Sequence, residues 1–199
     1  MYHLAKDRDL QSKAREEVLA VLAGRPEPTF RDLSKLPFLS ACIKEALRIN
    51  SPISLLPARW TVEHVNLGKY HIPAGTSVVP NISAVHQNDA NWPDAARFDP
   101  YRFINTHPKS NVNIPFGTGP RQCVARQFSL FEVRARSMYR FQILICFQQR
   151  TLLCMLLLHY EWSLPPGSIH ESQVKNEFGA FGLSIPHDLD IEFVRRKGE

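Results

Sequence analysis

Apolar and charged residues follow a helical period in two early parts of the chain. Residues 4–23 place their apolar positions mostly on one stripe among charged residues, and Gly24 followed by Pro26 is typical of a helix end. A second helix is predicted over residues 37–49, because proline is well tolerated in a first helical turn. No capping residue or entry segment precedes the first helix, so we expect the chain to begin partway through a larger protein.

The pattern changes after Pro52. Short β-branched and aromatic runs are separated there by glycine and proline turns, which favours strands over helices. These runs predict a small sheet formed by residues 58–66, 69–72 and 76–80.

An irregular segment and a mixed tail complete the pattern. Residues 88–121 are rich in Pro, Asn and Gly, and so long an irregular stretch in a compact domain is usually functional. A helix is predicted from about Val124, and short strands are predicted at residues 181–185 and 189–194. The predicted class is therefore α+β, mainly α-helical, with a small appended β-sheet.

Composition narrows the class of protein further. The 199 residues are 44% hydrophobic and 22% charged, which is typical of one globular domain. The net charge of +5 gives little support for nucleic-acid binding, because part of it lies in one short segment discussed below. No signal peptide is evident, and the longest apolar run, Leu152–Leu158, is far shorter than the ~20 residues that span a bilayer.

The four cysteines and the histidines show no metal-site spacing. No Cys-x-x-Cys pair occurs, so a disulfide framework or a zinc ribbon is not expected. We expect the protein to occupy a reducing compartment. His64, His71 and His107 likewise lack the spacing of zinc ligands.

The strongest local signal is residues 116–125, FGTGPRQCVA. This glycine-bearing loop delivers Cys123 to the predicted start of a helix, where amide dipoles and the nearby Arg121 favour a thiolate. A thiolate at this position can act as a metal ligand or as a nucleophile. The alternative is that Cys123 is a small buried hydrophobic residue, as lone cysteines often are.

The loop closely resembles the heme-binding loop F-x-x-G-x-R-x-C-x-A of the cytochrome P-450 superfamily, the heme-thiolate monooxygenases. Ala125 stands where that family more often has Gly. The resemblance implies that Cys123 is the axial ligand of heme iron, that Arg121 pairs with a heme propionate, and that Phe116 packs beside the sulfur. Gly119 is carried over as a cofactor-binding position of the same loop.

Two further motifs occur in the order expected for that family. Glu45 and Arg48 form E-x-x-R on the second helix, on one face, although most such pairs are solvated surface charges. Residues 93–103 resemble the segment P-x-x-x-x-F-x-P-x-R-F, whose arginine, Arg102 here, joins the E-x-x-R pair in a buried charge network. The resemblance assigns Glu45, Arg48 and Arg102 to that network.

The resemblance also suggests contacts around the cofactor. Arg59 matches a strand arginine that reaches the other propionate. Ile53, Leu55 and Leu56 would face the substrate, and the tail's Phe181 lies in the hairpin whose tip lines the same pocket. Plain core packing is an equally good interpretation of these apolar residues.

The family identity implies a heme b cofactor and insertion of one oxygen atom from O2 into a lipophilic substrate, with electrons from a flavoprotein reductase. Reductase docking would use basic residues of the proximal face, near Arg126, Arg134, Arg136 and Arg140, although solvated surface charge is the simpler interpretation of each. The chain resembles only the C-terminal portion of a eukaryotic or fungal-type member, without the oxygen-activation segment. Membrane attachment, expected at the endoplasmic reticulum, would come from the missing N-terminal part. The alternative function is a truncated, non-catalytic fragment that binds heme weakly or not at all.

Residues 135–150 make the helix after Cys123 16 residues longer than the family pattern. Removing these residues leaves one predicted helix with a continuous apolar face that reaches Trp162. Removing residues 134–149 leaves the same sequence, so the edges of the insertion stay open. The segment carries three Arg and no acid, so its deletion lowers the net charge from +5 to +2. We expect one partial domain over residues 1–199 with an insertion or a retained intron at 135–150. Sequencing the mature transcript across these codons tests that hypothesis.

A cysteine-nucleophile hydrolase is a third class. His86 and Asn88 are the available partners, but nothing in the sequence fixes their geometry toward Cys123. A surface histidine in a loop is the simpler interpretation of His86.

Overall fold

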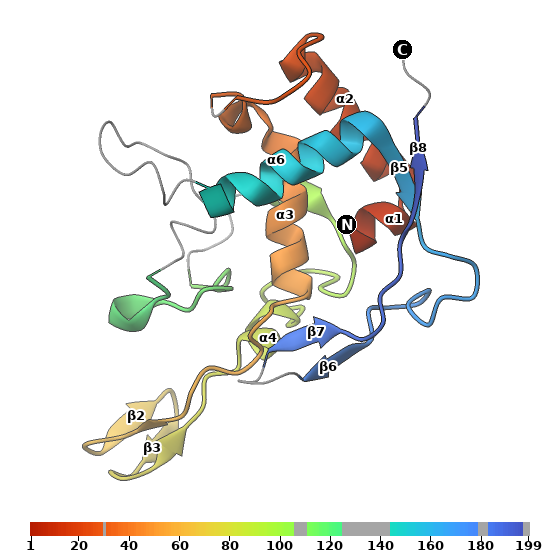
Figure 1. Ribbon diagram of the computed structural model, residues 1–199. Helices are drawn as coiled ribbons and strands as arrows, with labels where there is room; N and C mark the ends of the chain where they lie inside the picture. Colours follow the sequence, from red (N-terminus) through yellow and green to blue (C-terminus); the bar gives the residue numbers. More distant parts are fainter. Residues whose placement is uncertain (30, 106–110, 125–143, 179–182, 197–199) are drawn as a thin grey trace.

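The structure is a computed structural model of the chain, and it describes residues 1–29, 31–105, 111–124, 144–178 and 183–196. Its described part contains helices packed together at one end and four two-stranded antiparallel sheets around them (Figure 1). The α+β, mainly helical class is confirmed. The single small sheet predicted for residues 58–80 is instead two separate strand pairs.

The predicted first helix is two helices, α1 (Tyr2–Lys6) and α2 (Arg8–Leu22), which are separated at Asp7. The Asp7 carboxylate accepts hydrogen bonds from the backbone N–H groups of Asp9 and Leu10, at 3.1 and 3.0 Å. It therefore caps α2, since the first amides of a helix have no partner within the helix. The expectation of an uncapped helix over residues 4–23 was wrong because this cap lies inside the predicted range.

Helix α3 (Pro37–Ile49) has the predicted bounds, with proline in its first turn. Its N-terminus is capped from a neighbouring element rather than locally. The Glu17 carboxylate on α2 accepts from the amides of Phe38 and Leu39 at 2.8 and 2.9 Å. The interaction fixes the start of α3 against α2, and a carboxylate also suits the positive end of the helix dipole.

The core lies between α2, α3 and the long helix α6 (Leu144–His159), which crosses in front of α3 in Figure 1. Its most completely buried apolar side chains share this three-helix interface: Ala14, Val18, Leu22, Leu39, Cys154 and Leu157. Truncating a side chain such as Leu39 would leave a cavity and cost about 2–5 kcal/mol.

Helix α6 ends at His159, whereas the apolar pattern predicts a helix as far as Trp162. Residues Tyr160–Ser163 instead form strand β5, which pairs antiparallel with β8 (Glu192–Arg195). The buried side chain of Gln11 donates to the carbonyl oxygen of Trp162 at 2.9 Å, and its Oε1 accepts from the Trp162 amide at 3.2 Å. Sheet pairing and this bridge satisfy the backbone of β5, so the tertiary context overrides the helical pattern.

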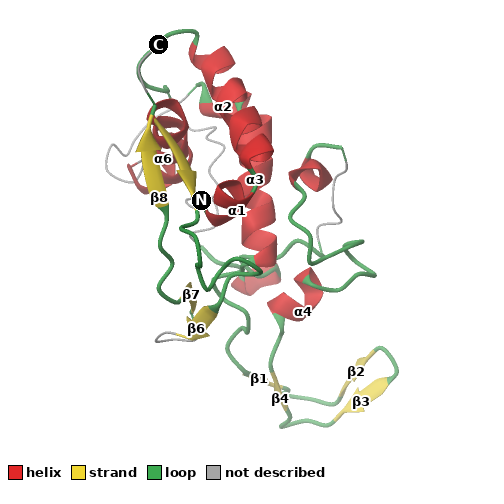
Figure 2. Ribbon diagram, turned by 90° about the vertical axis from the view of Figure 1, so that its right-hand side faces the viewer, coloured by secondary structure: helices red, strands yellow, loops and turns green. Residues whose placement is uncertain are grey.

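Two strand pairs extend away from the helices (Figure 2). Strand β1 (Arg59–Trp60) pairs with β4 (Ser77–Val78), and β2 (Val65–Leu67) pairs with β3 (Tyr70–Ile72) through a turn at Gly68. Gly68 has a φ of +60°, a conformation that glycine adopts without a steric penalty. The remaining pair is β6 (Asn176–Phe178) with β7 (Ser184–Pro186).

The irregular segment predicted at residues 88–121 contains only short 3-10 turns in its described part, η2 (Pro100–Phe103) and η3 (Gly119–Arg121); a third, η1 (Leu33–Lys35), precedes α3. The short helix α4 (Ile82–His86) lies just before it and was not expected. Asn81 caps α4 by accepting from the Ala84 amide at 2.9 Å.

Candidate heme-thiolate site

The loop that carries Cys123 is closed by its own backbone. The Cys123 amide donates to the carbonyl oxygen of Phe116 at 3.0 Å, and the Gln122 amide donates to that of Gly119 at 3.0 Å. Gly117 and Gly119 both have positive φ values, +72° and +75°, which non-glycine residues rarely adopt. The two glycines thus allow the chain to fold back so that Cys123 lies at the loop's end.

Cys123 is the exposed thiol among the three cysteines whose side chains the structure describes. Cys42 and Cys154 are buried in the core, and burial raises the pKa of each to about 12, so both remain protonated. The interpretation of Cys123 as a small buried hydrophobic residue was therefore wrong. A free, accessible thiol on a fixed loop is the soft donor that iron and other thiophilic centres require.

The segment 53–56 lies against this loop. A Cβ placed on Gly117 would lie 3.8 Å from Cδ1 of Leu56, so the loop and the segment are in close contact. The segment is held in place by pairing: Ile53 forms a bridge with Leu183, and Leu55 with Asn81.

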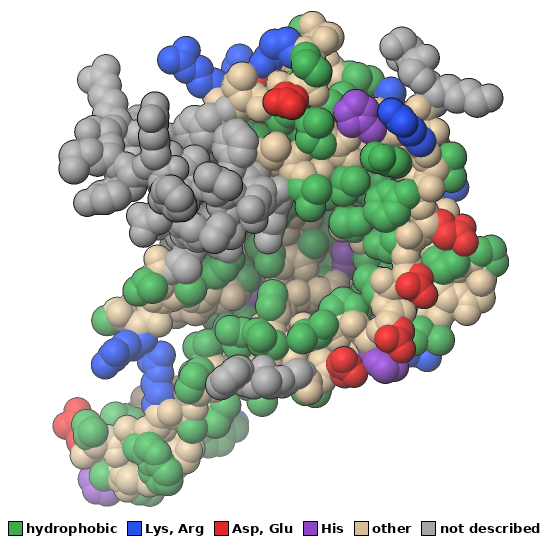
Figure 3. Space-filling model, viewed as in Figure 1, with side chains coloured by type: hydrophobic (Ala, Val, Ile, Leu, Met, Phe, Trp, Pro, Cys, Tyr) green, Lys and Arg blue, Asp and Glu red, His purple; other side chains and the backbone are tan. Residues whose placement is uncertain are grey.

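The apolar side chains of segment 53–56 face outward rather than into the core. Ile53 is 38% exposed and Leu55 is 54% exposed, while Leu56 is half-buried. Figure 3 shows exposed hydrophobic side chains around a hollow on the face that it views. For Ile53 and Leu55, plain core packing is therefore the weaker interpretation.

Arg59 and Arg121 are both exposed, on β1 and η3 respectively. Phe116 is half-buried, and Gly119 is exposed with open space where a Cβ would be. A thiol, two exposed cations and an apolar segment are the residue types that a group with iron, carboxylates and an apolar ring would need.

Glu45 and Arg48 form a fully buried ion pair on α3. Arg48 donates through Nε and Nη2 to the two carboxylate oxygens of Glu45, at 2.7 and 2.8 Å, and both side chains have no exposed surface. The remaining Arg48 donors reach the carbonyl oxygens of His86, Ala95 and Arg97 at 2.6, 2.8 and 3.3 Å. The guanidinium also lies 5.2 Å from the centre of the Trp92 ring.

Arg102 approaches the same carboxylate. Its Nε lies 3.4 Å from Oε1 of Glu45, and its two terminal nitrogens donate to the carbonyl oxygens of Pro93 and Asp94 at 2.5 and 2.8 Å. The Asp99 amide donates to Glu45 as well, at 3.0 Å. The structure thus brings together Glu45, Arg48 and Arg102 and uses them to hold the irregular segment 93–102 on α3.

His86 is buried in α4, so the interpretation of it as a surface loop residue was wrong. One ring nitrogen, Nδ1, lies 3.0 Å from Oγ of Ser51, and the other, Nε2, accepts from the Ile114 amide at 3.0 Å. Both nitrogens are therefore engaged away from Cys123, which removes the support for a cysteine hydrolase. The sequence did not indicate the burial of His86, because nothing in the local pattern distinguishes a buried histidine from an exposed one.

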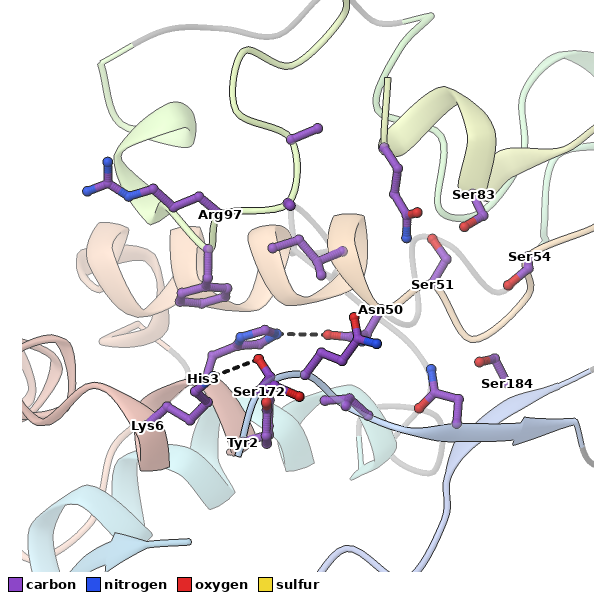
Figure 4. Close-up of a pocket in the computed structure, with 18 of the residues that line it drawn as sticks. Tyr2, His3, Lys6, Asn50, Ser51, Ser54, Ser83, Arg97, Ser172 and Ser184 are labelled. Atoms are coloured by element: carbon purple, nitrogen blue, oxygen red, sulfur yellow. Dashed lines mark hydrogen bonds between the residues drawn. The ribbon is translucent and has the colours of Figure 1, made fainter. Parts of the chain in front are cut away.

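A polar cavity of about 670 Å³ lies beside the C-terminal end of α3 (Figure 4). His3 points toward Asn50 there, with its Nε2 2.8 Å from Oδ1, and stacks on Phe98 at 4.1 Å between ring centres. Burial lowers the pKa of His3 to about 4. None of the predicted cofactor-binding residues lines this cavity.

Several predicted residues lie outside the described part of the chain: Phe181, the start of the helix after Val124, residues 135–143, and the basic residues Arg126, Arg134, Arg136 and Arg140. Within the described residues, no helix is both long enough and apolar enough to cross a membrane. Groups of three or more acidic, histidine or cysteine side chains that could hold a metal ion are likewise not found in that part.

Comparison with known proteins gives the family of the chain. The cytochrome P450 family model matches residues 1–188, so the chain belongs to the cytochrome P450 family, whose cofactor is heme b. Among the described cysteines, Cys123 is the one whose thiol is accessible to such a cofactor.

Similar curated proteins include rat cytochrome P450 4F4, 36% identical over 152 residues, and mouse leukotriene-B4 omega-hydroxylase 3, 34% identical over 152 residues. A human ultra-long-chain fatty acid omega-hydroxylase is 36% identical over the same length. Each alignment covers 72% of this chain but only 28–29% of the relative.

A solved structure, the retinoic acid-bound cyanobacterial CYP120A1, matches 97% of this chain with a TM-score of 0.75 and 24% identity, and the match covers 40% of that chain. This likeness shows the fold. It confirms that the described elements form part of a cytochrome P450 fold.

Proposed function

We propose that this chain provides the thiolate side of a heme-dependent monooxygenase, with Cys123 as the axial ligand of heme iron. The main support is the exposed Cys123 thiol at the end of a loop that is closed by a hydrogen bond to the Phe116 carbonyl oxygen. The other described thiols are buried and protonated. Bound heme would supply oxygen activation, which no amino-acid side chain provides.

The chain's own residues have three tasks in this proposal. Arg59 and Arg121 pair with the heme carboxylates, since guanidinium groups bind carboxylates with good geometry. Ile53, Leu55 and Leu56 exclude water from the apolar side, together with Phe181. Glu45, Arg48 and Arg102 keep α3 and segment 93–102 fixed beneath the loop.

The substrate is proposed to be lipophilic, because the segment expected to face it is apolar and exposed. Two relatives are named as omega-hydroxylases of leukotriene B4 and of ultra-long-chain fatty acids, which favours a long-chain carboxylic acid. Electrons would come from a flavoprotein reductase, and O2 is the co-substrate. The full-length parent is proposed to reside at the endoplasmic reticulum membrane.

A second candidate function is heme binding without oxygenation. It is favoured by the exposure of Ile53 and Leu55, 38% and 54%, which leaves much of the apolar segment open to water. Under this alternative the chain would bind heme weakly through Cys123 and would not turn over substrate.

The test is the carbon-monoxide difference spectrum of the purified chain with added heme, reduced by dithionite. Thiolate ligation predicts a strongly red-shifted Soret band that disappears in Cys123→Ala. Cys42→Ala is the matched control, since that thiol is buried in α3, and it should keep the band. A spectrum typical of histidine-bound or free heme in the unmodified chain would contradict the proposal. If the band is present, incubation with a reductase and a long-chain fatty acid separates the two candidate functions.

A further inference from the structure

The imidazole of His86 is bonded at both nitrogens, and each bond leads to a different part of the site. Nε2 accepts from the Ile114 amide at 3.0 Å, in the chain segment that enters the Cys123 loop. Nδ1 faces Oγ of Ser51, just beyond the end of α3, at 3.0 Å. The side chain has no exposed surface.

These bonds select one tautomer. A backbone N–H can only donate, so Nε2 must carry a lone pair and the proton must lie on Nδ1. The Ser51 hydroxyl oxygen accepts a hydrogen bond from this Nδ1–H, and the hydroxyl donates to the Leu47 carbonyl oxygen at 2.9 Å. A continuous chain of hydrogen bonds therefore connects α3 through neutral His86 to Ile114.

The backbone of Ile114 extends this chain of hydrogen bonds into the loop. Its carbonyl oxygen accepts from the Gly117 amide at 2.9 Å, and the next turn of the loop is closed by the bond between Cys123 and Phe116. His86 is anchored from the other side as well, because its carbonyl oxygen accepts from Arg48 at 2.6 Å.

We propose that His86 is a positioning residue for the thiolate loop: its neutral Nδ1–H tautomer fixes the entry of the loop, at Ile114, relative to the Glu45–Arg48 ion pair. The role of the loop rests on the proposed function. The hydrogen bond from the Ile114 amide to His86 does not depend on that function, because it forms in the protein without heme.

Two variants separate this role from simple core packing. In His86→Gln, the side-chain oxygen can occupy the place of Nε2 and accept from Ile114. In His86→Asn, the shorter amide can occupy the place of Nδ1 and reach Ser51, but nothing accepts from Ile114. Both variants lose a buried ring, so both lower the urea midpoint, and the difference between them isolates the bond to the loop.

The first measurement is the ¹⁵N spectrum of the His86 ring together with amide hydrogen exchange in the heme-free 199-residue chain. The unmodified chain should show the Nδ1–H tautomer and a protected Ile114 amide. Exchange at Ile114 should accelerate about tenfold in His86→Asn and remain near the unmodified rate in His86→Gln. An Nε2–H tautomer, or equal exchange in the two variants, would overturn the proposal.

The second measurement is heme titration. His86→Asn should weaken heme binding by about tenfold, and His86→Gln by less than about threefold, because only the first releases the loop. Equal weakening in both variants would also overturn the positioning role. Failure of the unmodified chain to bind heme through Cys123 would defeat the proposed function, while the exchange measurement would still decide the role of His86.

Discussion

Glu45→Gln is the substitution that most sharply tests the buried charge network. It preserves the shape of the side chain and removes its charge. Arg48 then remains fully buried with its three carbonyl acceptors, but without the carboxylate that holds Nε and Nη2 at 2.7 and 2.8 Å. Arg102 also loses the carboxylate that its Nε approaches at 3.4 Å.

Removing one partner of a buried ion pair costs about 3–5 kcal/mol, because the other charge stays buried without compensation. The three carbonyl groups around Arg48 still accept hydrogen bonds from it and reduce this cost, so we expect the free energy of unfolding to fall by about 3 kcal/mol. That is a large fraction of the 5–15 kcal/mol that stabilises a typical domain. Removal of Glu45 should therefore shift the unfolding transition strongly.

The assay is urea unfolding followed by circular dichroism, analysed by linear extrapolation. Glu177→Gln is the matched control, because Glu177 pairs with His187 on the surface, where both side chains are more than half exposed. The control should lose less than about 0.5 kcal/mol. A loss below about 1 kcal/mol for Glu45→Gln would refute the reasoning, since it would mean that the pair is not needed to hold α3 and segment 93–102 together.

Further outcomes are expected elsewhere in the molecule. Burial and the nearby Arg48 lower the pKa of His86 from 6.5 to about 4, and burial lowers the pKa of His3 to about 4 as well, so the unfolded chain binds protons first on acidification. Stability should fall as the pH decreases from about 6.5 to 4, with about 3 kcal/mol of the loss due to His86; in a pH series of urea titrations His86→Gln should remove that share and leave the share of His3. Asp7→Ala should cost about 1 kcal/mol of unfolding free energy through loss of the α2 cap, whereas Asp190→Ala, at an exposed position, should cost almost nothing. Iodoacetamide should label Cys123 in the folded chain and leave Cys42 and Cys154 unmodified, as peptide mass mapping would show; labelling of either buried thiol at the same rate would contradict the structure.

The motifs with strong local chemistry were predictable from the sequence. Helix α3 begins and ends where the proline and the apolar period place it, and the loop 116–123 follows from two glycines and a cysteine in family order. The buried Glu45–Arg48 pair could be proposed from the family resemblance, because three-residue spacing on a helix is by itself equally compatible with solvated surface charges.

Features that depend on distant contacts were not predictable. Strand β5 forms only because β8 and Gln11 satisfy its backbone, and α3 is capped by Glu17 from another helix. The burial of His86 is set by α3 and by Ile114, which lies 28 residues further along the chain. In each case the deciding partner lies far from the residue in sequence, beyond the reach of a local pattern.

Iron K-edge X-ray absorption of the heme-loaded chain tests the central claim most directly, because it detects the atom bound to iron. Ligation by Cys123 predicts a sulfur scatterer in the first coordination shell of the unmodified chain and of Cys42→Ala, and its absence in Cys123→Ala. A first shell of nitrogen and oxygen alone in the unmodified chain would contradict the account.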